Sequence, residues 1–453
     1  MVHYWLNKNY LYFEEAIELD STYADAYALL GLLQFFSMTT NKMGNSSNIS
    51  VMEESILNAE TSLLYDPDNE LGNASMVFLP MMLLTQYDYY KDNKFFKARN
   101  IAIKADKLIN KFPDSPLSHL IMGYFYWNRN KIIKDDNNSI LALEHMLKVV
   151  EITKNQALTK DPLHKPILDQ ALQDVPSIYT EIGQGENAVK FISNNKKYYC
   201  GDGTFECLGV WTLNQIITTF YQSYYYKEAF EAINIILART DEELINTGHG
   251  IQSKTTTLFM SGLIHMKWGK YDKAINDFEE CLEIIKVLEQ ANVTFDEELL
   301  MHRIGLNHYY NGNMKVANEI LLEGIEIWNI NNINTENIIW DGLGQLNVLC
   351  GLTSLMNGNI EKAKTTISKV ESQLDDMEMK LEQKNEYFIY YYLYLYYNEL
   401  NQSSKAFKNL ETAYNNIDKK QIDQYNNHPE KDTHPRFFYC RDIITAYESN
   451  LNQ

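Results

Sequence analysis

Positive charge is scarce in this sequence, and the shortage excludes a first class of functions. Lysine and arginine number 40 against 60 aspartate and glutamate residues, which gives a formal net charge of −20. A field of this sign repels phosphate backbones and anionic lipid, and no stretch gathers enough basic residues to offset it. We therefore predict no nucleic-acid or membrane partner. The expected partner is a protein or peptide that is neutral or basic.

Cysteine and long apolar runs are scarce as well. Five cysteines are too few and too scattered for a disulfide framework, although Cys200 and Cys207 could pair or share a metal ion. No second close pair completes a tetrahedral metal site. The longest apolar stretch, SMVFLPMMLLTQ, is shorter than the roughly 20 residues of a membrane helix, and Pro80 interrupts it. With no signal peptide at its start, the chain is expected to be cytoplasmic and to hold no cofactor or metal.

Signatures of catalysis are also missing. The sequence has no HExxH, GxSxG, CxxC or paired-carboxylate pattern. GHGIQSKT, at 248–255, resembles a phosphate-binding loop, but Ser253 stands where the second glycine is required and no apolar strand precedes it. We interpret it as a loop in which Ser253 or Thr255 caps the next helix. The protein is therefore predicted not to be an enzyme.

What the sequence does contain is a helical pattern, clearest in MSGLIHMKWGKYDKAINDFEECLEI at 260–284. Gly262 lies on a first predicted helix, and Ala274 and Phe278 share one face of a second. Two antiparallel helices that pack closely need small residues where their backbones approach, and Gly262 and Ala274 supply them. Phe278 then fills the space beneath, and Tyr271 covers the turn.

The pattern recurs along the chain at a nearly constant period. Gly305 and Gly351 repeat the small residue of the first helix. An alanine follows each predicted turn, and successive alanines stand 41 to 46 residues apart. Such regularity predicts an array of helix pairs without a separate catalytic domain. The alanines are Ala98, Ala142, Ala188, Ala229, Ala274, Ala317, Ala363 and Ala406.

This order of a small residue, an aromatic, alanine and phenylalanine resembles the tetratricopeptide repeat, strongly over 258–370. The period exceeds the usual 34 residues and approaches that of armadillo and HEAT repeats, which are the competing interpretation. The resemblance implies an all-α solenoid of stacked antiparallel helix pairs in a right-handed superhelix, with first helices lining a concave groove. We expect degenerate repeats over 1–200, a connecting loop at 201–210, clearer repeats over 211–420, and a loop with a C-terminal capping helix over 421–453.

The resemblance implies a non-catalytic scaffold that binds a peptide or partner helix in the groove. Long-period arrays of this kind resemble the C-terminal parts of bacterial regulators, so a sensor or regulatory half of a signalling or transcriptional regulator is the alternative. An all-helical enzyme is less favoured. Some members clamp a chaperone's acidic tail with an asparagine after the small residue of the first helix. That role is excluded here because other residues follow the glycines: Leu32, Tyr124, Leu263, Leu306 and Leu352.

Several aromatic and histidine side chains are candidates for sites, and each also has a structural interpretation. His265 and His308 take the aromatic position of their repeats, so we predict that they pack between helices. The run YFIYYYLYLYYNEL at 387–400 is aromatic on every face, which predicts burial, with some tyrosines reaching the groove. HPEKDTHPR carries His428 and His434 with two acids, but this spacing matches no metal site.

The two ends of the chain are unusual for such an array. YLYFEEAIELD, near the start, is interpreted as the second helix of a pair whose first helix is missing. We expect that the chain once followed another domain or that this end docks onto a partner; the alternative is a frayed terminal helix. RFFYCRDIITAYESNL, at the other end, is a first helix without a second and is expected to serve as a cap.

Overall fold

Every regular element of the described residues in the computed structural model is an α-helix, which confirms the predicted all-α class for that part of the chain. A 45% apolar content with helical periodicity favours this outcome, because each helix can bury one stripe against its neighbours. The structure describes residues 2–40, 45–86, 94–133, 135–156, 164–246, 252–289, 297–331, 343–375, 386–427 and 439–451.

The chain divides into two compact units. Unit 1 comprises Met1–Ser223 with Ile245–Gly248, and unit 2 comprises Tyr224–Leu244 with His249–Gln453. The predicted connecting loop at 201–210 therefore lies inside unit 1. The predicted division into degenerate and clearer repeats stays a prediction.

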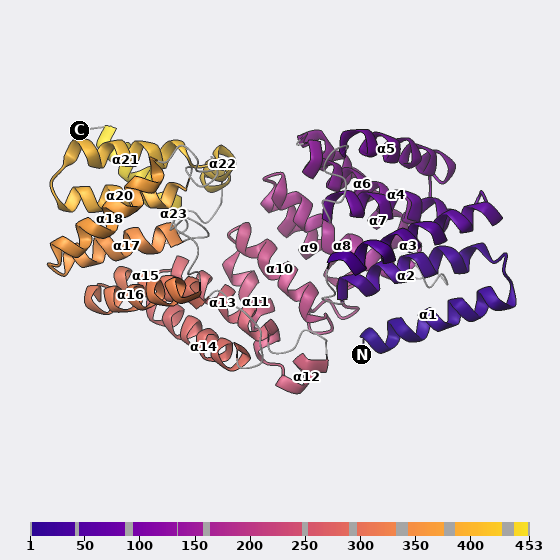
Figure 1. Ribbon diagram of the computed structural model, residues 1–453, viewed down its shortest axis with the longest axis horizontal. Coiled ribbons are helices and arrows are strands. Elements are labelled where there is room, and N and C mark those ends of the chain that lie inside the picture. The colour runs from indigo at the N-terminus through magenta and orange to yellow at the C-terminus, as the bar shows by residue number, and fades with distance from the viewer. Residues whose placement is uncertain are drawn as a thin grey trace. The chain divides into compact units, whose positions relative to one another are not determined.

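Unit 1 is built from helix pairs that pack in the order of the sequence (Figure 1). α2 packs against α3, α4 against α5, α6 against α7 and α8 against α9, while α1 packs against α2. The helices are α1 (Val2–Leu19), α2 (Ala24–Thr40), α3 (Asn45–Tyr65), α4 (Glu70–Gln86), α5 (Lys94–Lys111), α6 (Pro116–Ile133), α7 (Asp136–Gln156), α8 (His164–Glu181), α9 (Gly185–Tyr199) and α10 (Val210–Gln222).

Unit 2 repeats this arrangement. α13 pairs with α14, α15 with α16, α17 with α18 and α20 with α21, and α23 packs against α21. Its helices are α11 (Tyr226–Leu237), α13 (Gln252–Lys267), α14 (Tyr271–Glu289), α15 (Glu297–Tyr310), α16 (Met314–Asn331), α17 (Leu343–Met356), α18 (Ile360–Leu374), α20 (Tyr387–Glu399), α21 (Ser403–Asn415), α22 (Lys419–Asn427) and α23 (Tyr439–Leu451). The short α12 (Asp241–Asn246) completes the set of described helices.

The turn inside each pair follows the same period as the alanines. Gly269, after α13, has a φ of 69°, a left-handed conformation that glycine adopts without a Cβ clash. The amide of Lys270 then donates to the carbonyl of His265 at 2.9 Å and closes the helix end. Residues with positive φ occupy the turns between helices at positions 41 to 46 residues apart: Gly183, Tyr224, Gly269, Gly312, Gly358 and Asn401. Gly203, in the loop between α9 and α10, also has a positive φ but lies outside this series.

Close approach within the pairs explains the small residues of the first helices. A Cβ on Gly262 would lie 2.6 Å from Cε1 of Phe278, and one on Gly305 would lie 2.6 Å from Cγ of Leu321. Gly351 stands in the same relation to Ile367, at 2.7 Å. A side chain at any of these positions therefore displaces a large residue of the second helix.

The alanines after the turns are buried wherever their side chains are described. Exposure is 2% for Ala406 and 0% for Ala142, Ala188, Ala229, Ala274, Ala317 and Ala363. Ala98 lies in α5, but its side chain is outside the described residues. Phe278 is also 0% exposed, whereas Tyr271 is half-buried and stacks on Tyr310 at 5.7 Å.

Some sequence-based expectations differ from the structure. α13 begins at Gln252, so Ser253 and Thr255 lie inside that helix and are buried, not at its N-cap. The segment after 420 is not all loop, because α22 extends to Asn427. His428 and His434 lie outside the described residues.

The tyrosine-rich helix α20 is buried on several faces, as predicted. Tyr392 and Tyr396 are among the largest fully buried side chains, and Tyr391 and Tyr397 are at most 9% exposed. At the C-terminal end, the ring of Tyr447 in α23 stacks on Tyr414 of α21 at 4.2 Å. Among the described helices, none combines the length and hydropathy needed to cross a membrane.

The four cysteines whose side chains the structure describes fall into two classes. Cys200 and Cys207 form a disulfide, which settles the pairing that the sequence left open. Cys281 and Cys350 are free and buried, and burial raises the pKa of these thiols to about 12 and about 11.

We predict that Cys281 and Cys350 resist alkylation in the native protein, because the thiolate is the reactive form and burial suppresses it. After treatment of the native protein with iodoacetamide at pH 8, peptide mass mapping should find both cysteines unmodified. Both should be fully labelled only after denaturation. Rapid native labelling of either cysteine would contradict their packing between helices.

Candidate functional site

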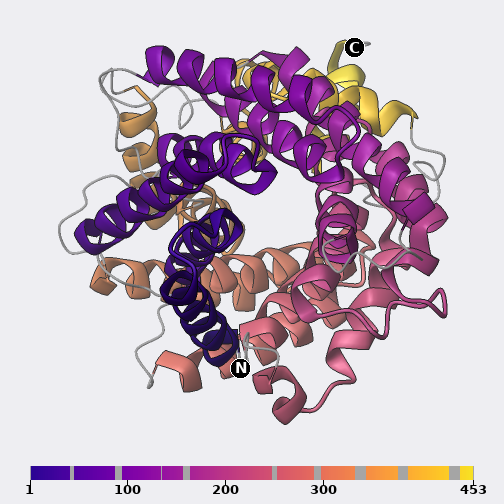
Figure 2. The same ribbon diagram turned by 90° about the vertical axis from the view of Figure 1, so that its right-hand side faces the viewer.

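The first helices of unit 1 pack side by side, each against the next first helix along the chain. α2 contacts α4, α4 contacts α6, α6 contacts α8, and α8 contacts α10. Figure 2 shows these helices in colours that run from indigo through purple to magenta. A ligand that lies across the first helices therefore meets side chains from several repeats at once.

Hydrogen bonds between side chains one repeat apart join these helices. The side-chain amide of Asn69, the residue before α4, donates to Asp25 on α2 at 2.6 Å. Glu70 accepts from Ser118 on α6 at 3.0 Å and also from Ser115. The acceptor in each of these bonds is a carboxylate, so the contacts between neighbouring first helices place negatively charged groups there.

The most enclosed carboxylate is that of Asp174 on α8. Tyr124 on α6 donates its hydroxyl to Oδ2 of Asp174 at 2.6 Å, and Gln170 donates an amide hydrogen to the same oxygen at 3.0 Å. Burial raises the pKa of Asp174, although these two hydrogen bonds oppose the increase. Both donors are neutral, so among the described residues no cation balances this charge.

A second carboxylate lies about two helical turns further along α8. The indole of Trp127 donates to Oε2 of Glu181 at 2.6 Å. Oε1 of Glu181 accepts from Asn130 and from Ser139, each at 3.3 Å. We call the set Tyr124, Trp127, Gln170, Asp174 and Glu181 the α6–α8 face.

Helical register explains why these side chains meet. Gly123 faces α7, where an added Cβ would lie 2.7 Å from Cε of Met146. The next residue, Tyr124, is rotated by about 100° and points toward α8. Trp127 follows three positions later and lies on the same side of the helix.

Unit 2 contains a cluster of serine, histidine and aspartate that is not a catalytic triad. Asp277 on α14 accepts from Ser261 at 2.7 Å and from Nδ1 of His265 at 2.6 Å. Since the serine donates to the carboxylate and not to the imidazole, His265 does not activate it. The ring of Phe230 lies 4.8 Å from that of His265, in keeping with the predicted packing role.

Two histidines meet where α6 packs on α7. Nδ1 of His119 lies 2.8 Å from Nδ1 of His145, and Nε2 of His119 donates to the carbonyl of Pro113 at 2.9 Å. A neutral imidazole carries one N–H, and His119 uses it at Nε2. Nδ1 of His119 therefore accepts, and Nδ1 of His145 is the donor. Burial, then the neighbouring His119, lowers the pKa of His145 to about 4. No group of three potential metal ligands occurs among the described residues.

We predict that acid destabilises unit 1 through this pair. The folded-state pKa of His145 lies below the unfolded value of about 6.5, so its contribution is complete above pH 6.5 and falls progressively toward pH 4. After discounting for solvent at this half-buried ring, the loss is about 1–2 kcal/mol. Denaturant unfolding at several pH values, monitored by hydrogen exchange in α6 and α7, should show this loss of stability. His145→Gln should flatten the dependence of stability on pH. An unchanged profile in the variant would contradict the assignment.

The sequence indicated little of the α6–α8 face. Tyr124 stood out only because it follows Gly123, and the other four residues were not identified. Pro176 of α8 occupies the position that a small residue takes in the clearer repeats, so the register of α8 could not be aligned with theirs.

Residues 255–287 match the sequence model of the tetratricopeptide repeat family. These residues form α13 and α14 with the left-handed turn between them. Residues 255–287 are a tetratricopeptide repeat. The resemblance carried by Gly262, Ala274 and Phe278 is thereby confirmed. No curated protein matches the sequence.

Several solved structures with helical repeats are similar to this chain. The apo form of the quorum sensor NprR from B. thuringiensis is 15% identical over 89% of this chain and 100% of that chain, with a TM-score of 0.48. A Rap protein complexed with competence and sporulation factor is 15% identical, over 88% and 99%, with a TM-score of 0.45. Human IFIT1 with PPP-AAAA is 11% identical, over 89% and 80%, with a TM-score of 0.39.

Proposed function

We propose that this chain is a non-catalytic, cytoplasmic scaffold whose α6–α8 face binds a basic peptide segment or partner helix. The observation that carries the proposal is the enclosed carboxylate of Asp174, whose two hydrogen-bond donors, Tyr124 and Gln170, are neutral. A buried carboxylate without a countercharge is costly, so a cationic side chain that reaches it gains a strong charge-assisted bond.

The surrounding residues suit the same kind of ligand. Tyr124 and Trp127 present aromatic rings beside the two carboxylates, and a lysine or arginine interacts favourably with such rings. Glu181 is exposed, so it attracts a cation from solvent, whereas Asp174 is more enclosed. The net charge of −20 adds a long-range attraction for basic partners.

The proposal is tested by titrating the full chain with matched fluorescent peptides of equal length that differ only in charge. A peptide rich in lysine and arginine should bind, and its affinity should weaken as salt rises from 50 to 300 mM because the charges are screened. Neutral peptides should bind more weakly and acidic ones not at all. Tighter binding of the acidic peptide, or no binding by any peptide, would overturn the proposal.

Nucleic acid is the alternative class of ligand, and the same titration tests it. Its exclusion rests on the sign of the charge, and a single-stranded oligonucleotide of the same length provides the comparison. We expect no binding of the oligonucleotide at 150 mM salt. Saturable oligonucleotide binding with no peptide binding would replace the proposed function.

A regulatory role is compatible with the same face. A sensor converts peptide binding into a change seen elsewhere on the molecule, so hydrogen exchange in unit 2 should change when the peptide binds to unit 1. Exchange changes confined to α6 and α8 favour a simple scaffold instead.

A further inference from the structure

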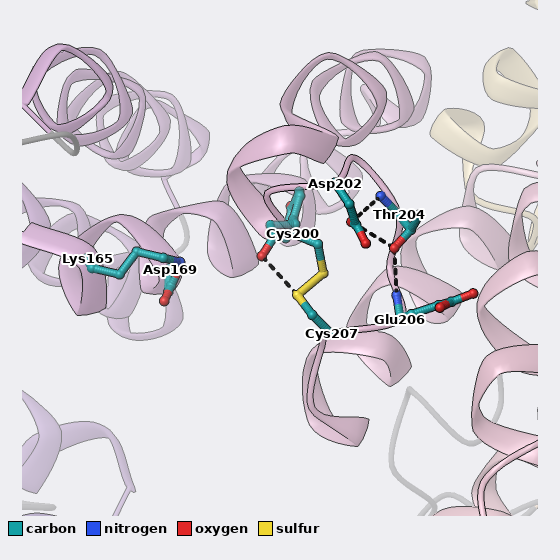
Figure 3. Close-up of a disulfide and its surroundings, with 8 residues drawn as sticks. Lys165, Asp169, Cys200, Asp202, Thr204, Glu206 and Cys207 are labelled. Carbon is teal, nitrogen blue, oxygen red and sulfur yellow. Dashed lines mark hydrogen bonds and ion pairs between the residues drawn. A yellow bond between two sulfur atoms is a disulfide. The ribbon is translucent and has the colours of Figure 1, made fainter.

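The Cys200–Cys207 disulfide closes a short loop between α9 and α10 in unit 1 (Figure 3). Cys200 directly follows Tyr199, the last residue of α9, and Sγ of Cys207 lies 3.5 Å from the carbonyl oxygen of Tyr199. The bond therefore ties the loop back onto the end of α9. Cys200 is 2% exposed, whereas Cys207 is exposed.

The loop is internally ordered around this link. Asp202 accepts from both the amide and the hydroxyl of Thr204 at 2.9 Å (Figure 3). Phe205 is 3% exposed, and its ring packs edge-on against Tyr199 at 6.1 Å. Lys196 of α9 lies 4.7 Å from the ring of Phe205. The loop thus holds an aromatic side chain against the tyrosine that precedes the disulfide.

Tyr199 connects this loop to the α6–α8 face. Its hydroxyl donates to the carbonyl of Leu172 on α8 at 2.5 Å, two residues before Asp174. Tyr199 is 6% exposed, and the charge of Asp174 adds to burial in raising the pKa of this phenol. Tyr199 therefore connects the disulfide-bonded loop to the segment of α8 that carries Asp174.

We propose that the Cys200–Cys207 disulfide is a redox control on the binding face of α8, an inference that rests on the proposed function. In the oxidised state the loop holds Tyr199 against α8 and fixes the position of Asp174. Reduction frees the loop, releases Phe205 from Tyr199 and loosens this part of α8, so a basic peptide binds less tightly.

The chemistry requires a dithiol reductant. Its thiolate attacks the sulfur of Cys207, the more exposed residue of the pair, forms a mixed disulfide and displaces Cys200 as a thiolate, which takes up a proton. The second thiol of the reductant then attacks the mixed disulfide and releases Cys207, also protonated. Two electrons and two protons pass to the protein, and the reductant leaves as a disulfide.

The test compares the full oxidised chain with the same chain in dithiothreitol, by hydrogen exchange and by titration with the basic peptide. Exchange at amides of α8 and the end of α9 should accelerate at least about fivefold on reduction. Peptide affinity should fall about tenfold. The variant Cys207→Ser should match the reduced protein and should not respond to dithiothreitol.

The two readouts separate this inference from the proposed function. If no peptide binds the oxidised protein, the proposed function fails, and hydrogen exchange alone then decides whether the disulfide controls α8. Equal exchange at α8 and α9 in both redox states would overturn the inference. Accelerated exchange with unchanged peptide affinity would also overturn it, because the loop would then not reach the binding face.

Discussion

Asp174→Asn should weaken the binding of a basic peptide about tenfold to a hundredfold. The substitution keeps the shape of the side chain but removes the charge that a lysine or arginine would neutralise. A hydrogen bond to a charged group contributes about 1.5–3 kcal/mol, which corresponds to this change in affinity. The folded protein should lose little stability, because a buried carboxylate without a countercharge is removed. Titration of the full chain with the fluorescent peptide measures the effect.

Asp169→Asn is the matched control for this variant. Asp169 lies on the same helix and carries the same charge, but its side chain is 41% exposed and is paired with Lys165. Its loss should change peptide affinity less than about twofold, since exposed ion pairs contribute little. Equal effects of the two substitutions would mean that net charge alone, and not the position of Asp174, controls binding.

Phe278→Ala should produce the largest loss of stability in unit 2, about 3–5 kcal/mol. The ring is 0% exposed and fills the space against Gly262 that two closely packed helices leave. Alanine removes most of the side chain, and the rigid backbones of α13 and α14 cannot collapse into the cavity. Hydrogen exchange of amides in these two helices measures the loss locally, because a chain of two units need not unfold in one step.

Three further variants distinguish the effect of close packing from that of hydrophobic burial alone. Gly262→Ala adds a methyl group that collides with Phe278 and should cost about 1–3 kcal/mol. Combining it with Phe278→Leu should cost less than the two single changes together, because the smaller side chain makes room. Ile360→Ala, at a position 47% exposed, should change stability by no more than about 0.5 kcal/mol. Strict additivity of the first pair would contradict the contact between Gly262 and Phe278.

The fold was predictable because close helix packing restricts residue type at fixed positions. Glycine at 262, 305 and 351 faces large side chains of the second helix, and an added Cβ there has no room. These constraints recur with every pair and therefore appear in the sequence as a period. The turns also favour one residue type, glycine, at a fixed position. Tyr224 and Asn401 occupy that left-handed position without being glycine, so their turns were harder to recognise in the sequence.

The α6–α8 face was not predictable because it depends on contacts between repeats. Tyr124 and Asp174 are 50 residues apart, and nothing in either segment alone indicates that they meet. The repeat that contains Asp174 also has Pro176 where a small residue is typical, so its register was obscured. The disulfide was left open for a related reason, since pairing depends on the distance between Cα atoms and not on sequence spacing.

Ligands are proposed to bind across the first helices of unit 1. Hydrogen exchange of the full, oxidised chain with and without saturating basic peptide tests this proposal most directly. We predict that protection increases in α6 and α8, around Tyr124 and Asp174, while α7 and α9 are unchanged. Protection confined to α7 and α9, or to unit 2, would contradict the account.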